Sequence, residues 1–161
     1  AVHLTQIVNF LKLILKNHNM PFLIKDDLNT VSTTEIIDLI TNSNDNIVDE
    51  IIGECIDVMI TYLGSYYDMD SAFAEVGANR NKTLVKYLKA LVIYEIPKRR
   101  GKRVPRDEAE DYNEAMNWLE KVAAGEWRAN LPPKKEVTED GSSKDIGFYK
   151  LKSNKSYKNH W

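Results

Sequence analysis

Hydrophobic residues recur at helical spacing along most of the chain. The first run predicts an amphipathic helix from His3 to Asn17, because its apolar positions share one face: Leu4, Ile7, Val8, Leu11, Ile14 and Leu15. Pro21 ends that pattern. A shorter run predicts a helix ending near Thr41, preceded by a capping-box signature in which the Ser32 hydroxyl and the Glu35 carboxylate satisfy backbone amides.

The longest stripe predicts a helix from Ile47 to about Tyr67, roughly 30 Å long. Its apolar positions are Val48, Ile51, Ile52, Cys55, Met59, Tyr62, Leu63 and Tyr66. Loops are expected on either side, over residues 42–46 and 69–79. The next stripe predicts a helix with Lys82, Lys86 and Lys89 on its exposed side, stopped by Pro97, and its apolar members are Leu84, Val85, Leu88, Leu91, Val92 and Ile96.

The last helix has start and stop signals at both ends, with Pro105 in its first turn and Gly125 just beyond its last. Trp118 is expected at the edge of its buried face, which should contain Tyr112, Ala115, Met116, Leu119, Val122 and Ala123. Together the stripes predict an all-α fold, a compact bundle of about four to five helices.

A chain of 161 residues favours one domain. We expect a helical domain over residues 1–130, with residues 1–20 as an N-terminal helical extension, and an extended C-terminal arm over residues 131–161 that becomes ordered on a partner. Residues 146–151 could form only a brief strand. No apolar run is long enough to cross a bilayer, and no signal-peptide pattern is present.

Charge is sorted into blocks along the chain. Twelve acidic residues and no Lys or Arg lie between Asp26 and Asn79, whereas ten basic residues and only Glu95 among acids lie between Arg80 and Arg106. Residues 107–127 return to seven acids against Lys121. Such blocks can pair within one fold or between copies of it, and the second arrangement suits head-to-tail rings. The pattern favours an assembly protein over a catalyst.

The sequence motifs that would indicate catalysis or ligand binding are weak. Gly77, Lys82 and Thr83 lack the glycine spacing of a phosphate loop, and the asparagines of residues 42–46 lack the carboxylates of a calcium loop. The histidines are scattered, and the single cysteine, Cys55, lies on an apolar stripe. We therefore predict no catalytic, cofactor-binding or metal-binding residues, and an enzyme stays a residual alternative.

The segment from Lys98 to Arg106 could be a solvated loop, a nucleic-acid contact, or an intersubunit or portal contact. The interface prediction names Lys98, Arg99, Arg100, Lys102, Arg103 and Arg106. In the arm, aromatic residues alternate with lysines, a combination favoured at protein interfaces, and the predicted contacts are Phe148, Tyr149, Tyr157 and Trp161.

The segment DYNEAMNWLEKVAAGEW, followed by NLPP, resembles the closing part of the small helical head-to-tail connector proteins of tailed phages, in particular the Mu-like prophage connector family. The matching positions are Tyr112, Ala115, Trp118, Leu119, Ala124, Gly125, Leu131 and Pro132. Two upstream helical segments are also similar, so the resemblance covers about residues 22–133. The extensions at both ends and the asparagines of residues 42–46 depart from the family pattern.

The resemblance implies a neck ring in the virion, commonly of twelve copies, that joins the portal to the tail and surrounds the DNA channel. Its partners would be further copies, the portal, another neck or tail protein, and DNA that passes without sequence-specific binding, with no membrane involved. Assembly would occur in the host cytoplasm. An acidic lumen is possible if Asp49, Glu50, Glu54 and Asp57 face inward. The alternative is a small nucleic-acid-binding regulatory protein that uses the basic loop of residues 98–106.

Overall fold

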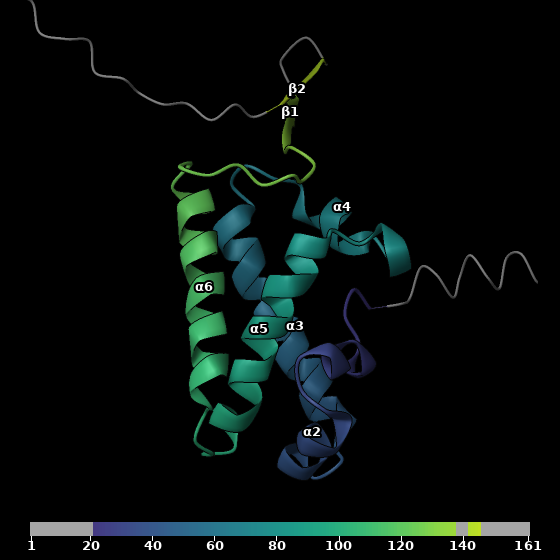
Figure 1. Ribbon diagram of the computed structural model, residues 1–161. Coiled ribbons are helices and arrows are strands. Elements are labelled where there is room, and N and C mark those ends of the chain that lie inside the picture. Colours follow the sequence, from purple (N-terminus) through teal and green to yellow (C-terminus); the bar gives the residue numbers. More distant parts are fainter. Residues whose placement is uncertain (1–20, 138–141, 146–161) are drawn as a thin grey trace, which may run out of the picture.

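The computed structural model describes residues 21–137 and 142–145 (Figure 1). It is mostly helical, with one short two-stranded hairpin, and confirms the predicted all-α bundle. The described helices are η1 (Lys25–Thr30), α2 (Thr34–Thr41), α3 (Asp45–Leu63), α4 (Met69–Ala74), η2 (Gly77–Asn79), α5 (Lys82–Arg99) and α6 (Arg106–Ala123). The strands are β1 (Lys135–Val137) and β2 (Ser143–Asp145).

The long helices α3, α5 and α6 pack side by side, and α5 contacts both of the others (Figure 1). Leu88, Leu91 and Val92 of α5 are buried, so this helix meets its neighbours over much of its surface. The η1 and α2 segments pack against α3 and α5, and α6 lies on the other side of that pair (Figure 1). Lys25 of η1 ties this flank together through ion pairs with Asp38 of α2 and Asp45 of α3.

Pro97 does not stop its helix as predicted, because α5 continues to Arg99. A proline inside a helix removes one backbone donor and crowds the preceding turn. Here it lies in the last turn of α5, so the amide that Pro97 lacks leaves a single carbonyl, that of Ile93 four residues earlier, without its helical donor. The Pro97 carbonyl accepts hydrogen bonds from the amides of Arg100 at 3.1 Å and Lys102 at 2.9 Å.

Two local predictions near the shorter helices are also wrong. Thr33, not Ser32, is the N-cap of α2, and it makes no side-chain capping bond, so the capping box does not form. Residues 69–79 are not a plain loop but contain α4 and η2. The Asp68 side chain caps α4 by accepting from the amide of Ser71 at 3.1 Å. Burial of Met69 and Ala72 holds this short helix against the core.

Trp118 is buried rather than at the edge of α6, with 8% of its surface exposed. Its ring stacks on Tyr87 of α5 at a centroid distance of 4.8 Å. Ala115, Leu119 and Val122 are buried as predicted, whereas Tyr112, Met116 and Ala123 are half-buried. Trp118 therefore occupies part of the buried face that the helical periodicity assigned to Tyr112, Met116 and Ala123.

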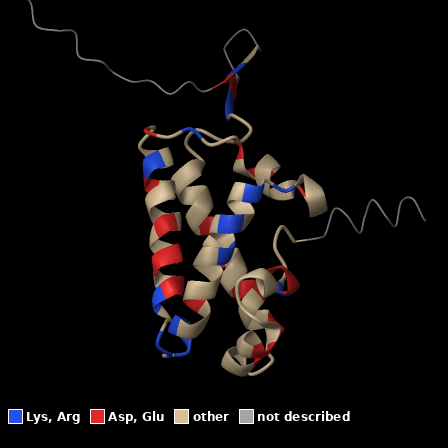
Figure 2. Cartoon of the chain, in the orientation of Figure 1, with Lys and Arg blue, Asp and Glu red and all other residues tan. Residues whose placement is uncertain are grey.

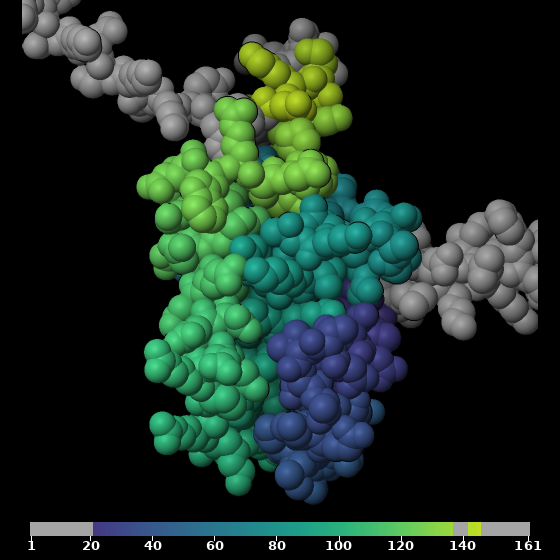
Figure 3. Space-filling view, viewed as in Figure 1, coloured from purple at the N-terminus to yellow at the C-terminus, as the bar shows by residue number. Residues whose placement is uncertain are grey.

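The chain after α6 returns across the end of the bundle before it forms the hairpin. Pro132 accepts from the amide of Asp68 at 2.9 Å, and Lys134 donates its amide to Tyr66 at 2.9 Å. Strands β1 and β2 then pair antiparallel, and the hairpin projects from the body (Figure 3). The predicted helix of residues 3–17 and the predicted strand within residues 146–151 lie outside the described residues. Among the described helices, none is both long and apolar enough to span a membrane.

Candidate functional site

The basic loop lies at one end of the bundle, where it joins α5 to α6 (Figure 2). Gly101 adopts a φ of 64°, a left-handed conformation that glycine takes without strain, and this allows the tight turn after α5. Lys98 and Arg99 belong to the last turn of α5, and Arg106 is the first residue of α6. The structure therefore divides the predicted interface residues between two helix ends and a short loop.

Three of these cations form ion pairs within the chain. Lys98 pairs with Glu95 at 2.8 Å, and Arg106 pairs with Glu110 at 2.8 Å. Arg99 reaches across to α3, where it contacts Glu54 and lies 3.7 Å from Glu50. These four ion pairs all have solvent-exposed members, so each contributes little to stability.

Arg100 has a structural contact of a different kind. Its guanidinium donates to the backbone carbonyl of Thr41 at 3.0 Å. Thr41 is fully buried in the last turn of α2, where carbonyl groups have no helical partner and a cation is favoured. Arg100 therefore caps α2. The side chains of Lys102 and Arg103 form no hydrogen bond or ion pair within residues 21–137 and 142–145, and both are exposed.

The acids predicted for a lumen all lie exposed on α3. Glu50 and Glu54 are the partners of Arg99, so two residue sets that the sequence analysis placed on separate surfaces meet in one subunit. Asp49 and Asp57 have no side-chain ion pair within the described part of the chain. The contact between Arg99 and Glu54 joins residues 45 positions apart, which a linear charge pattern cannot reveal.

Arg80, the first residue of the basic block, is a structural residue that the sequence analysis did not single out. Its guanidinium binds both oxygens of Asp27, at 2.6 and 3.1 Å, and also donates to the Phe22 carbonyl at 2.8 Å. Each side chain of the pair is only 20% exposed. The hydrogen bonds from Arg80 lower the pKa of Asp27 below its usual value. This contact fixes the segment before η1 to the start of α5.

Opposite charges also follow neighbouring helices along the body. Figure 2 shows basic residues along α5 and acidic residues along α6. One contact joins them, because Lys86 pairs with Glu114 at 2.8 Å and lowers the pKa of that carboxyl. Asp107 and Asp111 form no ion pair with any described residue. Part of the acidic surface of α6 is therefore available to an external cation.

An exposed apolar patch lies on α2, which the sequence analysis did not predict. Leu39 is 83% exposed and Ile36 is 50% exposed. Ile36 also lines a shallow hollow of about 110 Å³ that extends to Lys102 and Arg103 of the basic loop. The patch was detectable in the sequence, since the apolar residues Ile36, Ile37, Leu39 and Ile40 span a wider arc of this short helix than one contact with the core covers.

A second hollow of about 110 Å³ opens where α3, α5 and α6 meet. Its apolar lining includes Val58, Leu91 and Met116, and Glu54 and Glu95 supply carboxylates. Cys55 also lines it, and burial together with Glu95 raises the pKa of this thiol to about 12. Such a thiol stays protonated at neutral pH and is a poor nucleophile.

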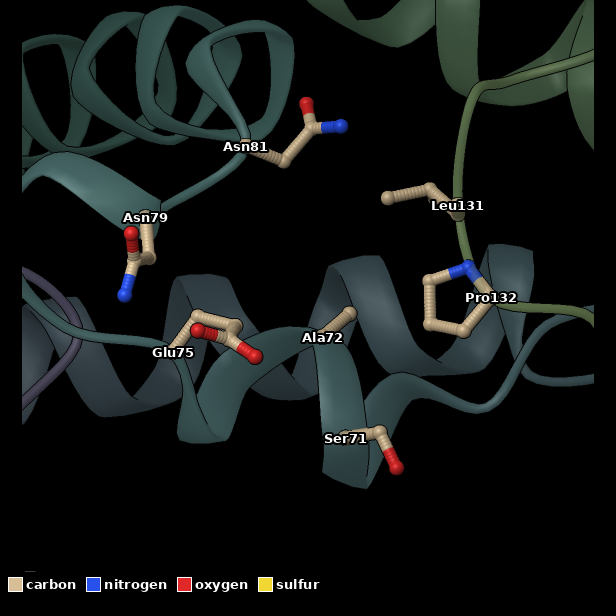
Figure 4. Close-up of a pocket in the computed structure, with 7 residues that line it drawn as sticks. All are labelled: Ser71, Ala72, Glu75, Asn79, Asn81, Leu131 and Pro132. Atoms are coloured by element: carbon tan, nitrogen blue, oxygen red, sulfur yellow. The ribbon is translucent and has the colours of Figure 1, made fainter.

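A third hollow, of about 580 Å³, lies between α4, the start of α5 and residues 131–132 (Figure 4). It is open, and its lining combines the polar side chains of Glu75, Asn79 and Asn81 with the apolar ones of Ala72, Leu131 and Pro132. The amide oxygen of Asn81 accepts from the amides of Thr83 and Leu84 and so caps α5. Its amide nitrogen donates to the Asn130 carbonyl at 2.8 Å. The Asn81 side chain is thus committed to holding the fold.

The described residues contain no group of three or more His, Cys, Asp or Glu side chains that could hold a metal ion. The predicted arm contacts, Phe148, Tyr149, Tyr157 and Trp161, lie outside the described residues.

Comparison with protein families shows that the family model described as "Bacteriophage Mu, Gp36" matches residues 23–147. Comparison with the curated proteins and with the solved structures found no match. The matched range covers all the described helices and both strands of the hairpin.

Proposed function

Because the chain belongs to the bacteriophage Mu Gp36 family, we propose that this phage protein is a structural component of the virion, a neck-ring subunit that joins the portal to the tail. In this proposal about twelve copies close into a ring around the DNA channel. The subunits assemble in the host cytoplasm and remain at the neck of the particle. Their role is mechanical rather than catalytic.

The observation that carries the proposal is that some charged side chains have ion-pair partners within the subunit and others have none among the described residues. Lys102 and Arg103 at one end of the bundle, and Asp107 and Asp111 on α6, have no ion-pair partners in the described part of the subunit. Charges that a subunit leaves unpaired on different surfaces can pair between copies or with a neighbouring protein. A closed ring uses such heterologous contacts at every interface.

The basic loop supports DNA binding less well. Four of its six cations already contact Glu95, Glu50 and Glu54, the Thr41 carbonyl, or Glu110. Lys102 and Arg103 alone have no such contact among the described residues, and two phosphate contacts give a salt slope of only about −2. Affinity for duplex DNA that is lost steeply with salt would favour the regulatory alternative.

The test is electron microscopy of the full-length protein mixed with the portal protein of the same phage. The proposal predicts a closed ring of this protein on one end of the portal. Native mass spectrometry of the same mixture would give the number of copies. A protein that stays monomeric and leaves the portal unoccupied at all concentrations would contradict the proposal.

The test variant reverses the charge at the unpaired loop positions, Lys102→Glu with Arg103→Glu, and its matched control reverses two lysines elsewhere. This variant should fold normally, because both side chains are exposed, but should bind the portal or its neighbours less well. Reversal of Lys135 and Lys144 in the projecting hairpin changes the net charge equally at another surface. A ring that forms equally well with both variants would show that the loop is not an assembly surface.

A further inference from the structure

An exposed apolar surface lies next to the point where the described chain begins. Six large apolar side chains are exposed among the described residues, and four of them fall within residues 24–39, namely Ile24, Val31, Ile36 and Leu39. We call the surface of residues 24–39 the N-terminal flank. We propose that residues 3–17 of the same chain pack on this flank as an amphipathic helix. The contact lies within one subunit and does not depend on the proposed ring.

The N-terminal flank has the properties of a receiving surface. Leu39 exposes 83% of its surface, Ile36 exposes 50% and Val31 exposes 46%. The η1 and α2 segments of the flank pack against each other and lie together at the surface of the molecule (Figure 3). Apolar side chains gathered in one region, unlike single scattered ones, mark a surface that a partner covers. Covering them removes apolar area from water, which favours the contact.

Residues 3–17 have the properties of the occupant. The apolar positions of the predicted helix share one face: Leu4, Ile7, Val8, Leu11, Ile14 and Leu15. A helix of this length is only marginally stable alone in water, and most of its stability comes from packing of its apolar face. The stripe that predicts the helix therefore also calls for an apolar surface on which it can pack.

The connection between the two surfaces is short. Phe22 and Leu23 are buried, so they fix the beginning of the described chain to the body, and η1 begins at Lys25. The four residues from Asn17 to Pro21 span at most about 14 Å, so the predicted helix, about 22 Å long, is held beside the flank. A short tether of this kind gives a millimolar effective concentration, which favours the chain's own segment over that of a second copy.

Charge also favours this occupant. Residues 1–20 contain Lys12 and Lys16 and no acidic residue. On the flank, Asp26 and Glu35 are exposed and have no ion-pair partner among the described residues. Figure 2 shows acidic residues over both η1 and α2. Lys12 is expected at the edge of the apolar face, where its long side chain can reach a carboxylate beside the docked helix.

Other cations near the flank set the direction of the helix. The basic loop contributes two cations to the hollow beside Ile36, and these would repel lysines. Lys12 and Lys16 belong to the second half of the segment, which the connection to Pro21 keeps near η1. Residues 4–11 contain no charged side chain, so they are the part that reaches α2.

The first experiment measures how fast a maleimide labels Leu39→Cys in the full-length protein. Ile7→Asp with Leu11→Asp, added to this variant, places charge on the apolar face of the segment. The labelling rate should then rise about tenfold, because the docked helix is released. Thr5→Asp with Asn9→Asp is the matched control, since it adds the same charge on the opposite face and should leave the rate unchanged.

The reciprocal experiment changes the flank and observes the segment. In the full-length protein, the amides of residues 3–17 should exchange hydrogen about tenfold more slowly than in a free peptide of the same sequence. Leu39→Asp should remove this protection without unfolding the subunit, because Leu39 is exposed. Trp127→Asp is the control, since Trp127 is also exposed, at 45%, but lies beyond the end of α6.

A cross-link distinguishes the chain's own segment from that of a second copy. The full-length chain with Leu11→Cys and Leu39→Cys is treated with a short bis-maleimide at micromolar concentration. An internally cross-linked monomer is the expected product. The native Cys55 should react slowly, because its thiol is buried and its pKa is about 12. A ladder of covalent oligomers would show that the segment docks on another copy, and would overturn the inference.

The outcomes also separate this contact from the proposed function. Equal labelling of Leu39→Cys in all three proteins, or exchange in residues 3–17 as fast as in the free peptide, would overturn the docked helix. Neither result would touch the neck-ring proposal, because the portal is absent from these measurements. A portal that stays unoccupied would, in turn, leave the docked helix standing.

Discussion

Arg80 and the loop pair Lys102 and Arg103 belong to the same basic block in the sequence but have different surroundings in the structure. Arg80 is mostly buried and holds Asp27 and the Phe22 carbonyl. The side chains of Lys102 and Arg103 are exposed and form no hydrogen bond or ion pair with the described residues. The comparison teaches that a charge block contains both structural and available cations, and that only contacts in space separate the two kinds.

Substitution of Arg80 by Ala should give the largest loss of stability in this comparison. It removes charge-assisted hydrogen bonds and leaves the Asp27 carboxylate only 20% exposed and without its main partner. We expect the free energy of unfolding to fall by about 2–3 kcal/mol, measured by urea denaturation. Arg80→Lys is the control, and it should lose less because the charge remains. A change below about 0.5 kcal/mol would show that the contact is not structural.

The same contact predicts a dependence of stability on pH. Arg80 holds the pKa of Asp27 below its ordinary value. A carboxyl with a lowered pKa in the folded state stabilises the protein fully above the unfolded pKa, which is about 3.9, and loses this contribution as the pH falls through the folded value. Acid unfolding below about pH 4 should therefore be less steep in Arg80→Ala. The prediction would be contradicted if the free energy of unfolding fell equally steeply with pH in the two proteins.

Arg100 is intermediate, because it caps a helix without a carboxylate partner. Its contact with the Thr41 carbonyl satisfies the last turn of α2. Arg100→Ala should destabilise the protein by about 1 kcal/mol, and hydrogen exchange should increase first in α2. Arg106→Ala is a matched control, since the Arg106 side chain is 88% exposed and its loss should have little effect. Equal effects of the two changes would contradict a capping role.

The sequence predicts the bundle well because its long helices bury wide apolar stripes. The stripes of α3, α5 and α6 are read directly from positions such as Val48, Leu88 and Leu119, all fully buried. Helix α4 was missed because six residues carry too little periodicity, and its stability comes from the Asp68 cap and from burial. The signal that could have found it is an aspartate three residues before Ser71.

The candidate site was less predictable, because its contacts join distant parts of the chain. Charge counting named Arg99 and Glu54 but assigned them to different surfaces, whereas the fold brings them together. It also placed Arg80 in the basic block without identifying its structural contact, because the partner Asp27 lies 53 positions earlier. A pattern along the chain reports which residues are charged, but not which of these charges the folded subunit neutralises.

The central claim is that Lys102 and Arg103 serve assembly and not the fold. The most direct test measures both properties in one variant, Lys102→Ala with Arg103→Ala. The account predicts a free energy of unfolding within about 0.5 kcal/mol of the unmodified protein, together with fewer occupied portals in electron micrographs at equal concentration. A variant that loses stability, or that occupies the portal as fully as the unmodified protein, would contradict it.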